Sequence, residues 1–152
     1  MSIMWQYLDK RSAAVSAIKD FDNMQFIIDH TDEDINRIRA EMTGIRSPGY
    51  DGMPKSHNPQ AGEECLLSSI EKIDLLKERY RQAQEYMDWF LPAWKELPEE
   101  DQFVLEAFYR DNEYGCNAAD AVSRRLCIER ASAYRRKNRA VEKLTIMLYG
   151  KF

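Results

Sequence analysis

The sequence predicts an all-α protein, in which a long antiparallel helical hairpin (residues 1–96) precedes a C-terminal three-helix domain of helix-turn-helix form (residues 97–152). Gly and Pro are few, at six and five of 152 residues, so long uninterrupted helices are allowed. Apolar residues recur at spacings of three and four rather than in alternation. A composition of 44% hydrophobic and 32% charged residues is typical of a folded helical protein rather than a disordered one.

The first helix is expected from Ile3 to about Met42, where neither Gly nor Pro occurs. Its apolar positions have helical spacing and include Val15, Ile18, Phe21, Met24, Ile28, Ile35, Ile38 and Met42. The segment forms one long helix or two in tandem. Thr31 followed three residues later by Asp34 has the form of a capping box, which places the expected break near His30.

A linker is expected at 44–62, because four Gly and three Pro interrupt any helix there. A second helix follows, about Glu63 to Glu96, with a kink expected at Pro92. Its apolar seam contains Leu66, Ile70, Ile73, Tyr80, Met87, Leu91 and Trp94, with Lys77 and Gln84 at the two remaining seam positions. Two such helices most simply fold back on each other as a hairpin. Since a two-helix hairpin buries little surface alone, we expect a homodimer through these N-terminal helices.

Three shorter helices are expected in the last third of the chain. The first spans Leu97 to Tyr109, with Pro98 preset for its first turn. Asn117 is expected to cap the second helix, Ala118 to Leu126, with Asp120 as its partner three residues on. Cys127 and Ile128 make a tight connection to the last helix, which runs from about Glu129 to Leu148 and ends at Gly150.

Charge is distributed unevenly along the chain. Residues 113–152 carry nine positive and four negative side chains, a net of +5, whereas the other 112 residues have a net charge of −9. A chain with a basic end and an acidic body meets a polyanion with one surface only. A short helix, a tight turn and a basic helix together predict a helix-turn-helix, whose second helix enters the major groove of double-stranded DNA.

Helical geometry divides the last helix into two faces. At about 100° per residue, the inward positions are Ala133, Ala140, Leu144 and Met147, and the outward positions are Ala131, Tyr134, Arg135, Asn138 and Arg139. The predicted base-reading residues are Arg130, Tyr134, Arg135 and Asn138, with Arg suited to guanine and Asn to adenine. The predicted phosphate contacts are Arg124, Arg125, Lys137 and Arg139. Arg136 flanks the inward face and either joins the DNA contact or pairs with acidic residues of the preceding helices.

The ordered motifs LPEEDQFVLEAFY, NAADAVSRRLCIERASAYRR and RAVEKL resemble the fourth conserved region of bacterial RNA polymerase sigma factors, over about Leu97 to Leu144. In that family the short helix ends in Leu-Gly-Ile and a Ser usually caps the recognition helix. Here Cys127 replaces the Gly and Glu129 replaces the Ser. The resemblance implies a DNA-binding helix-turn-helix with a turn that lacks its usual glycine.

Over nearly its whole length the chain is similar to RinA/ArpU-type late-gene transcriptional activators of phages and prophages. The similarity rests on the long N-terminal helices and on the loop YDGMPKS (Tyr50 to Ser56) before a second long helix. It implies a regulator of phage late or packaging genes. Two alternatives stay open: a small terminase subunit for DNA packaging, and an interaction module that binds RNA polymerase or another protein.

Other classes of function find little support in the sequence. We expect no enzyme, because the chain has no Gly-rich phosphate loop, nucleophile elbow or HExxH motif. No cofactor or metal is expected, since three Cys and two His are scattered along the chain. The lack of a signal peptide or membrane-spanning run, together with the odd number of cysteines, predicts a cytoplasmic protein.

Overall fold

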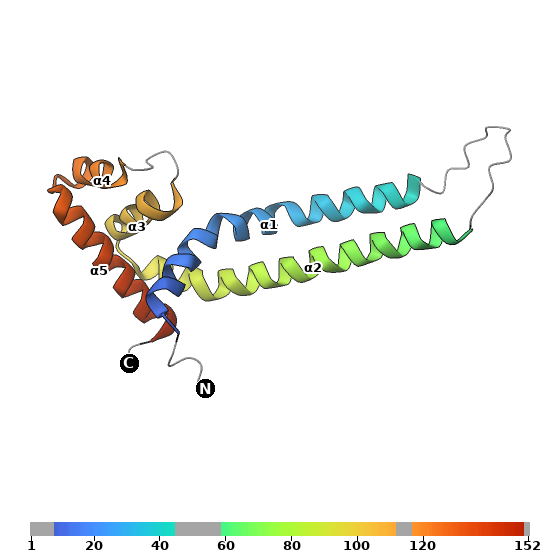
Figure 1. Ribbon diagram of the computed structural model, residues 1–152, viewed down its shortest axis with the longest axis horizontal. Coiled ribbons are helices and arrows are strands. Elements are labelled where there is room, and N and C mark those ends of the chain that lie inside the picture. Colours follow the sequence, from blue (N-terminus) through green and yellow to red (C-terminus); the bar gives the residue numbers. More distant parts are fainter. Residues whose placement is uncertain (1–7, 45–58, 112–116, 151–152) are drawn as a thin grey trace. The chain divides into compact units, whose positions relative to one another are not determined.

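The computed structural model describes residues 8–44, 59–111 and 117–150, and all its regular elements within these ranges are helical (Figure 1). They are α1 (Lys10–Gly44), α2 (Pro59–Glu96), α3 (Glu99–Leu105), the π-helical turn η2 (Glu106–Arg110), α4 (Ala118–Leu126) and α5 (Arg130–Tyr149). The all-α prediction is therefore confirmed. The predicted helical start at Ile3, the centre of the linker and the YDGMPKS loop lie outside the described residues.

The chain divides into two compact units, and α1 and α2 each contribute to both. The first unit contains residues 8–24 and 86–150, and the second contains residues 25–85. These units do not follow the boundary expected between Glu96 and Leu97. The physical reason is the packing of the first unit, in which the ends of α1 and α2 share a hydrophobic core with α3 and α5.

The core of the first unit joins residues that are far apart in the sequence. Its largest fully buried members include Ile18 of α1, Phe90 of α2, Leu105 of α3 and Leu144 of α5. Aromatic contacts extend this core, because the ring of Phe90 stacks on that of Trp94 at 5.6 Å. The helices of the predicted C-terminal domain therefore depend on the start of α1 and the end of α2 for their packing.

α1 begins at a capped N-terminus. The Asp9 carboxylate accepts hydrogen bonds from the Ser12 hydroxyl (2.7 Å) and the Ser12 backbone N–H (3.2 Å), as an N-cap residue does. These bonds lower the pKa of Asp9 below its ordinary value of 3.8. The predicted break near His30 is wrong. Thr31 is buried within a continuous helix and donates its hydroxyl to the carbonyl of Ile27, so it satisfies a helical acceptor instead of starting a new helix.

α2 begins earlier than expected, at Pro59 rather than Glu63, so Gly62 lies inside the helix. Proline suits a first helical position because its missing N–H would have no intrahelical acceptor there. The helix continues through Pro92 to Glu96. The side-chain amide of Gln102 then donates to the carbonyls of Trp94 and Leu97, at 2.9 and 3.0 Å, which satisfies acceptors at the end of α2.

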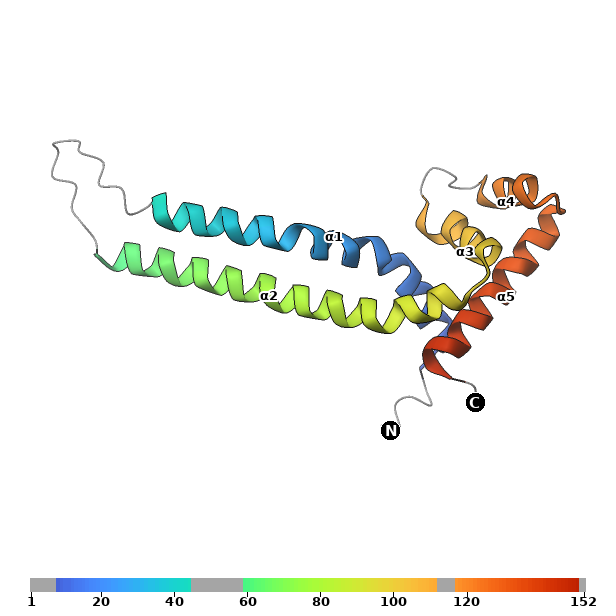
Figure 2. The same cartoon turned by 180° about the vertical axis from the view of Figure 1, so that it is seen from behind.

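In the second unit, residues 25–44 of α1 and 59–85 of α2 run side by side (Figures 1 and 2). Only four of its described side chains are buried: Thr31, Ile35, Ile73 and Ala83. By contrast, four large apolar side chains are exposed by 46% to 59%: Phe26, Leu67, Ile70 and Leu75. This unit therefore buries little apolar surface for its length.

Candidate nucleic-acid interface

The connection between α4 and α5 is a tight turn at the residue where the sigma pattern has Gly. Cys127 adopts the left-handed conformation, with φ of 53° and ψ of 45°. The backbone N–H groups of Cys127 and Ile128 both donate to the carbonyl of Ser123, and the Ser123 hydroxyl donates to the carbonyl of Ile128. The turn thus keeps a glycine-type geometry although a cysteine occupies it.

The helix ends around this turn match most of the sequence predictions. α4 spans the expected Ala118–Leu126, and α5 begins one residue later than expected, at Arg130. The predicted side-chain cap at Asn117 is wrong, because its side chain makes no cap hydrogen bond. Asp120 instead lies 3.7 Å from Nε of Arg130. Glu129 precedes α5 with an exposed side chain that forms no cap hydrogen bond, and its carbonyl accepts the N–H of Ala133.

A second hydrophobic core fixes this turn and the first half of α5. Its fully or almost fully buried residues come from α3, η2, α4 and α5: Val104, Ala107, Val122 and Ala133. Partly buried side chains pack against them, namely Phe103, Phe108, Leu126 and Ile128. Because both sides of the turn are held in one core, the exposed side chains of α4 and α5 are presented on a fixed framework.

The two predicted faces of α5 are confirmed with one exception. Ala133, Ala140 and Leu144 are fully buried, and the five residues predicted to point outward are all exposed. The exception is Met147, which is 40% exposed, so its predicted inward position is wrong. Val141 is fully buried in the first core instead. Near its C-terminus, α5 therefore packs against the core through Val141 and Leu144 and not through Met147.

Arg136 takes the second of its two predicted roles and pairs with acidic residues of α3. Its guanidinium binds the carboxylate of Glu100, and its Nε lies 3.2 Å from Oδ1 of Asp101. The other carboxylate oxygen of Asp101 accepts a hydrogen bond from Nζ of Lys143 at 2.9 Å. Asp101 is only 3% exposed, so these two cations satisfy a buried carboxylate and connect α3 to α5.

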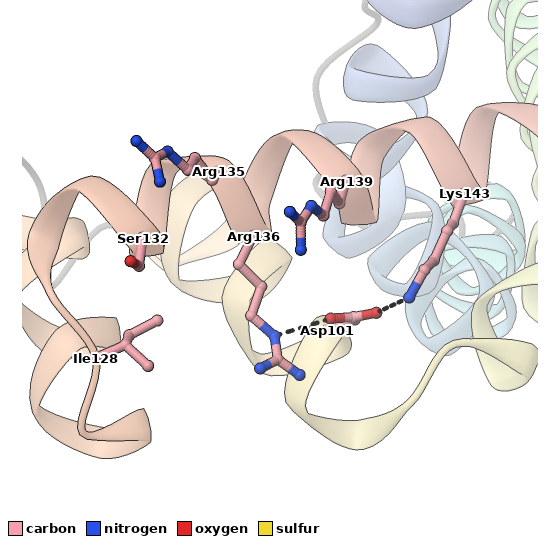
Figure 3. A pocket seen from close by; sticks show the side chains of 7 residues that line it. All are labelled: Asp101, Ile128, Ser132, Arg135, Arg136, Arg139 and Lys143. Carbon is pink, nitrogen blue, oxygen red and sulfur yellow. Dashed lines mark hydrogen bonds and ion pairs between the residues drawn. The ribbon is translucent and has the colours of Figure 1, made fainter.

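A cleft of about 420 Å³ lies along this side of α5. Figure 3 shows its lining: Asp101, Ile128, Ser132, Arg135, Arg136, Arg139 and Lys143. Four cationic side chains and one carboxylate thus line the cleft. In Figure 3 Arg139 extends toward the space between Arg136 and Lys143, whereas the guanidinium of Arg135 points away from Asp101. The excess of positive charge makes this surface attractive to anions.

Six of the eight predicted DNA contacts fall into two groups, while Arg130 lies near Asp120 and Asn138 is bound by Arg11. The side chains of Arg124, Arg135 and Arg139 form no hydrogen bond, ion pair or ring contact with the described part of the chain. Others lie against aromatic rings: the guanidinium of Arg125 is 4.3 Å from the ring centre of Phe103, and Nζ of Lys137 is 5.2 Å from that of Phe108 and 5.4 Å from that of Tyr134. Tyr134 also packs against Phe108, at 5.5 Å between ring centres, and is 41% exposed. The first group is thus the more available for a partner.

Sequence reasoning missed two residues at this surface. Lys143 was counted only as part of the basic charge, but it binds Asp101. Arg11, at the start of α1, donates a hydrogen bond from its guanidinium to Oδ1 of Asn138 at 2.7 Å. Arg11 and Asn138 are separated by 127 positions in the chain. No local sequence pattern predicts this contact, because the contact depends on how α1 packs against α5 in the first unit.

Comparisons with protein-family models, with curated proteins and with solved structures give no match for this chain. No helix among the described residues is long and apolar enough to cross a membrane. Within the same residues, no group of three or more His, Cys, Asp or Glu side chains is placed to hold a metal ion. The function is therefore inferred from the residues of the α4–α5 surface themselves.

Proposed function

We propose that this protein binds double-stranded DNA, with α4 and α5 acting as a helix-turn-helix and α5 entering the major groove. The observation that carries the proposal is a set of three exposed arginines, Arg124, Arg135 and Arg139, whose side chains have no partner among the described residues. They stand on helices whose other face is buried in a hydrophobic core. The left-handed turn at Cys127 supports the same interpretation, because it joins the short helix α4 to the basic helix α5 through a tight connection. In this arrangement Arg130, Tyr134, Arg135 and Asn138 face base edges, and the other predicted residues face phosphates.

The proposal is tested by measuring binding of fluorescent duplexes of random sequence at several salt concentrations. Wild-type protein is expected to bind at low salt and to lose affinity steeply between about 50 and 200 mM salt. Arg139→Ala is expected to weaken binding to every sequence and to reduce the salt slope by about one. Arg135→Ala, at a predicted base contact, is expected to relax sequence preference as well as affinity.

The matched control is Arg37→Ala, which removes the same charge from an exposed side chain of the second unit. Its affinity for duplexes is expected to equal that of the wild-type protein. The proposal fails when wild-type protein binds no duplex at low salt. It also fails when Arg37→Ala weakens binding as much as Arg139→Ala, because attraction would then depend on net charge and not on the α5 surface.

We further propose that this DNA binding serves regulation of phage or prophage late genes, as the resemblance to RinA/ArpU-type activators implies. A homodimer through the N-terminal helices would double the number of DNA contacts and match paired half-sites. The exposure of Phe26, Leu67, Ile70 and Leu75 in the second unit supports such a dimer. Analytical ultracentrifugation distinguishes this reading from the terminase alternative: a dimer supports the regulator, whereas a ring of many subunits supports a packaging role.

One observation favours the interaction module as a second candidate function. Ile146 and Met147 are exposed by 37% and 40%, and they line a cleft of about 400 Å³ together with Leu97 and Pro98. An apolar cleft at the end of a basic helix suits a hydrophobic side chain of a protein partner such as RNA polymerase. Met147→Glu is expected to abolish that binding and leave duplex binding unchanged. Pull-down with purified polymerase measures the first effect.

A further inference from the structure

The start of α1 reaches the proposed DNA-reading face of α5. Lys10 and Arg11 line a cleft of about 610 Å³ together with Asn138, Arg139 and residues near the end of α5. Within it, the Arg11 guanidinium donates to Oδ1 of Asn138 at 2.7 Å, and both residues are exposed. The contact joins a residue of α1 to one of the four residues expected to read bases.

Contacts on both sides of Arg11 hold the first turns of α1 in place, so the backbone position of Arg11 is fixed. Asp9 caps the helix through Ser12 on one side of Arg11. On the other side, Ala14 and Ile18 are fully buried, and Ile18 belongs to the core that contains Leu144 of α5. Both partners of the hydrogen bond therefore stand on helices packed in one core, which lowers the entropy lost when the bond forms.

Hydrogen-bond chemistry fixes how the Asn138 amide is oriented. A guanidinium has donors only, so the amide oxygen must face Arg11 and the amide NH₂ must face away from it. A bidentate contact to adenine needs both halves of the amide: the oxygen accepts from N6 of the base, and the NH₂ donates to N7. Arg11 takes up one of the two lone pairs of this oxygen and places a positive charge beside the other, while the amide NH₂ and the remaining guanidinium N–H groups are donors.

We infer that Arg11 is a specificity-determining residue and that the Arg11–Asn138 pair selects guanine rather than adenine. In the major groove guanine presents two acceptors, O6 and N7, whereas adenine presents one acceptor and one donor. A pair that offers mainly donors matches the two acceptors of guanine and sets the guanidinium charge against the N6 donor of adenine. The inference rests on the proposed function, and it revises the adenine preference that Asn138 has on its own.

The test is selection of bound duplexes from a pool with a randomised centre, followed by sequencing, for wild-type protein and single variants. Asn138→Ala identifies the position that this residue reads, because preference is lost there. Wild-type protein is expected to prefer guanine at that position. Arg11→Ala is expected to shift the preference toward adenine by about fivefold or more, the lower limit for one bidentate contact. Arg11→Lys keeps a donor and is expected to retain guanine.

Arg37→Ala is again the matched control for loss of one positive charge and is expected to select the wild-type sequences. Circular dichroism and thermal unfolding establish that each variant is folded. The inference is overturned when wild-type protein binds DNA but prefers adenine at the Asn138-dependent position, when no position depends on Asn138, or when Arg11→Ala selects the same sequences as the wild-type protein. Failure of wild-type protein to bind any duplex is a different result, which refutes the proposed function and the inference with it.

Discussion

Replacing Asp101 by Asn should lower the stability of the protein while strengthening its attraction to DNA. The side chain of Asp101 is 5% exposed and binds Nε of Arg136 at 3.2 Å and Nζ of Lys143 at 2.9 Å. Hydrogen bonds to charged groups contribute about 1.5–3 kcal/mol each. Lys143 and Arg136 are 56% and 35% exposed and regain water, and the Asn oxygen still accepts one bond. We therefore expect a loss of about 2 kcal/mol rather than the full sum.

The assay is thermal unfolding followed by circular dichroism. For a protein of this length, about 2 kcal/mol corresponds to a decrease in Tm of about 4–8 °C. The same substitution removes the one carboxylate that lines the cationic cleft. Duplex affinity at low salt is accordingly expected to increase, provided that the proposed function is correct, and the increase should disappear at high salt.

A Tm equal to that of the wild-type protein would refute the view that Asp101 connects α3 to α5. Glu100→Gln is the matched control, because it removes a negative charge that also pairs with Arg136 but lies on an exposed side chain. It is expected to change stability by less than about 1 kcal/mol. Equal losses of stability in the two variants would mean that burial of the Asp101 carboxylate does not determine its contribution to stability.

Three further predictions concern the framework. Leu144→Ala, at a fully buried position of the first core, is expected to destabilise the protein by about 3 kcal/mol in chemical denaturation, and a loss below about 1 kcal/mol would contradict its place in that core. Cys127→Gly is expected to preserve or raise Tm because glycine adopts φ of 53° without strain, whereas Cys127→Val should cost about 1 kcal/mol or more; the reverse order would refute the left-handed turn. The pKa of Asp9 is lowered by hydrogen bonds from Ser12, so its contribution to stability is present above pH 3.8 and is lost as pH falls through the folded pKa. Carboxyl NMR titration of Ser12→Ala should show this pKa rising toward 3.8, and an unchanged value would contradict the cap.

Local signals in the sequence predicted the last two helices well. The bounds of α4 were predicted to the residue and those of α5 to within one, since a turn precedes α5 and Gly150 follows it. Similar signals misled elsewhere. A Thr three residues before an acidic residue describes a capping box, but the hydroxyl of Thr31 bonds equally well to a helical carbonyl four residues back. The choice between the two depends on burial of Thr31, which local sequence does not contain.

Hydrophobic periodicity could not predict the long-range contacts of the α4–α5 surface. Helical spacing predicted the exposed face of α5, because it depends on α5 alone. It left the partners of Arg136 open, and it gave no sign that Arg11 would contact Asn138 across 127 positions. It also placed Met147 inward, since a helical wheel assumes that the covering elements extend along the whole helix. Such features follow from tertiary packing and not from the order of neighbouring residues.

The shared core of α1, α2 and α5 has a consequence for folding during synthesis. Ala17 and Ile18 are synthesised well before their partners Ala140 and Leu144, which lie about 120 residues further along the chain. At translation rates of about 5–20 residues per second, α5 is synthesised several seconds or more after the start of α1. During that interval the apolar side of α1 has no native partner on α5. A chain that ends prematurely before α5 would therefore be a natural substrate for chaperones and proteases.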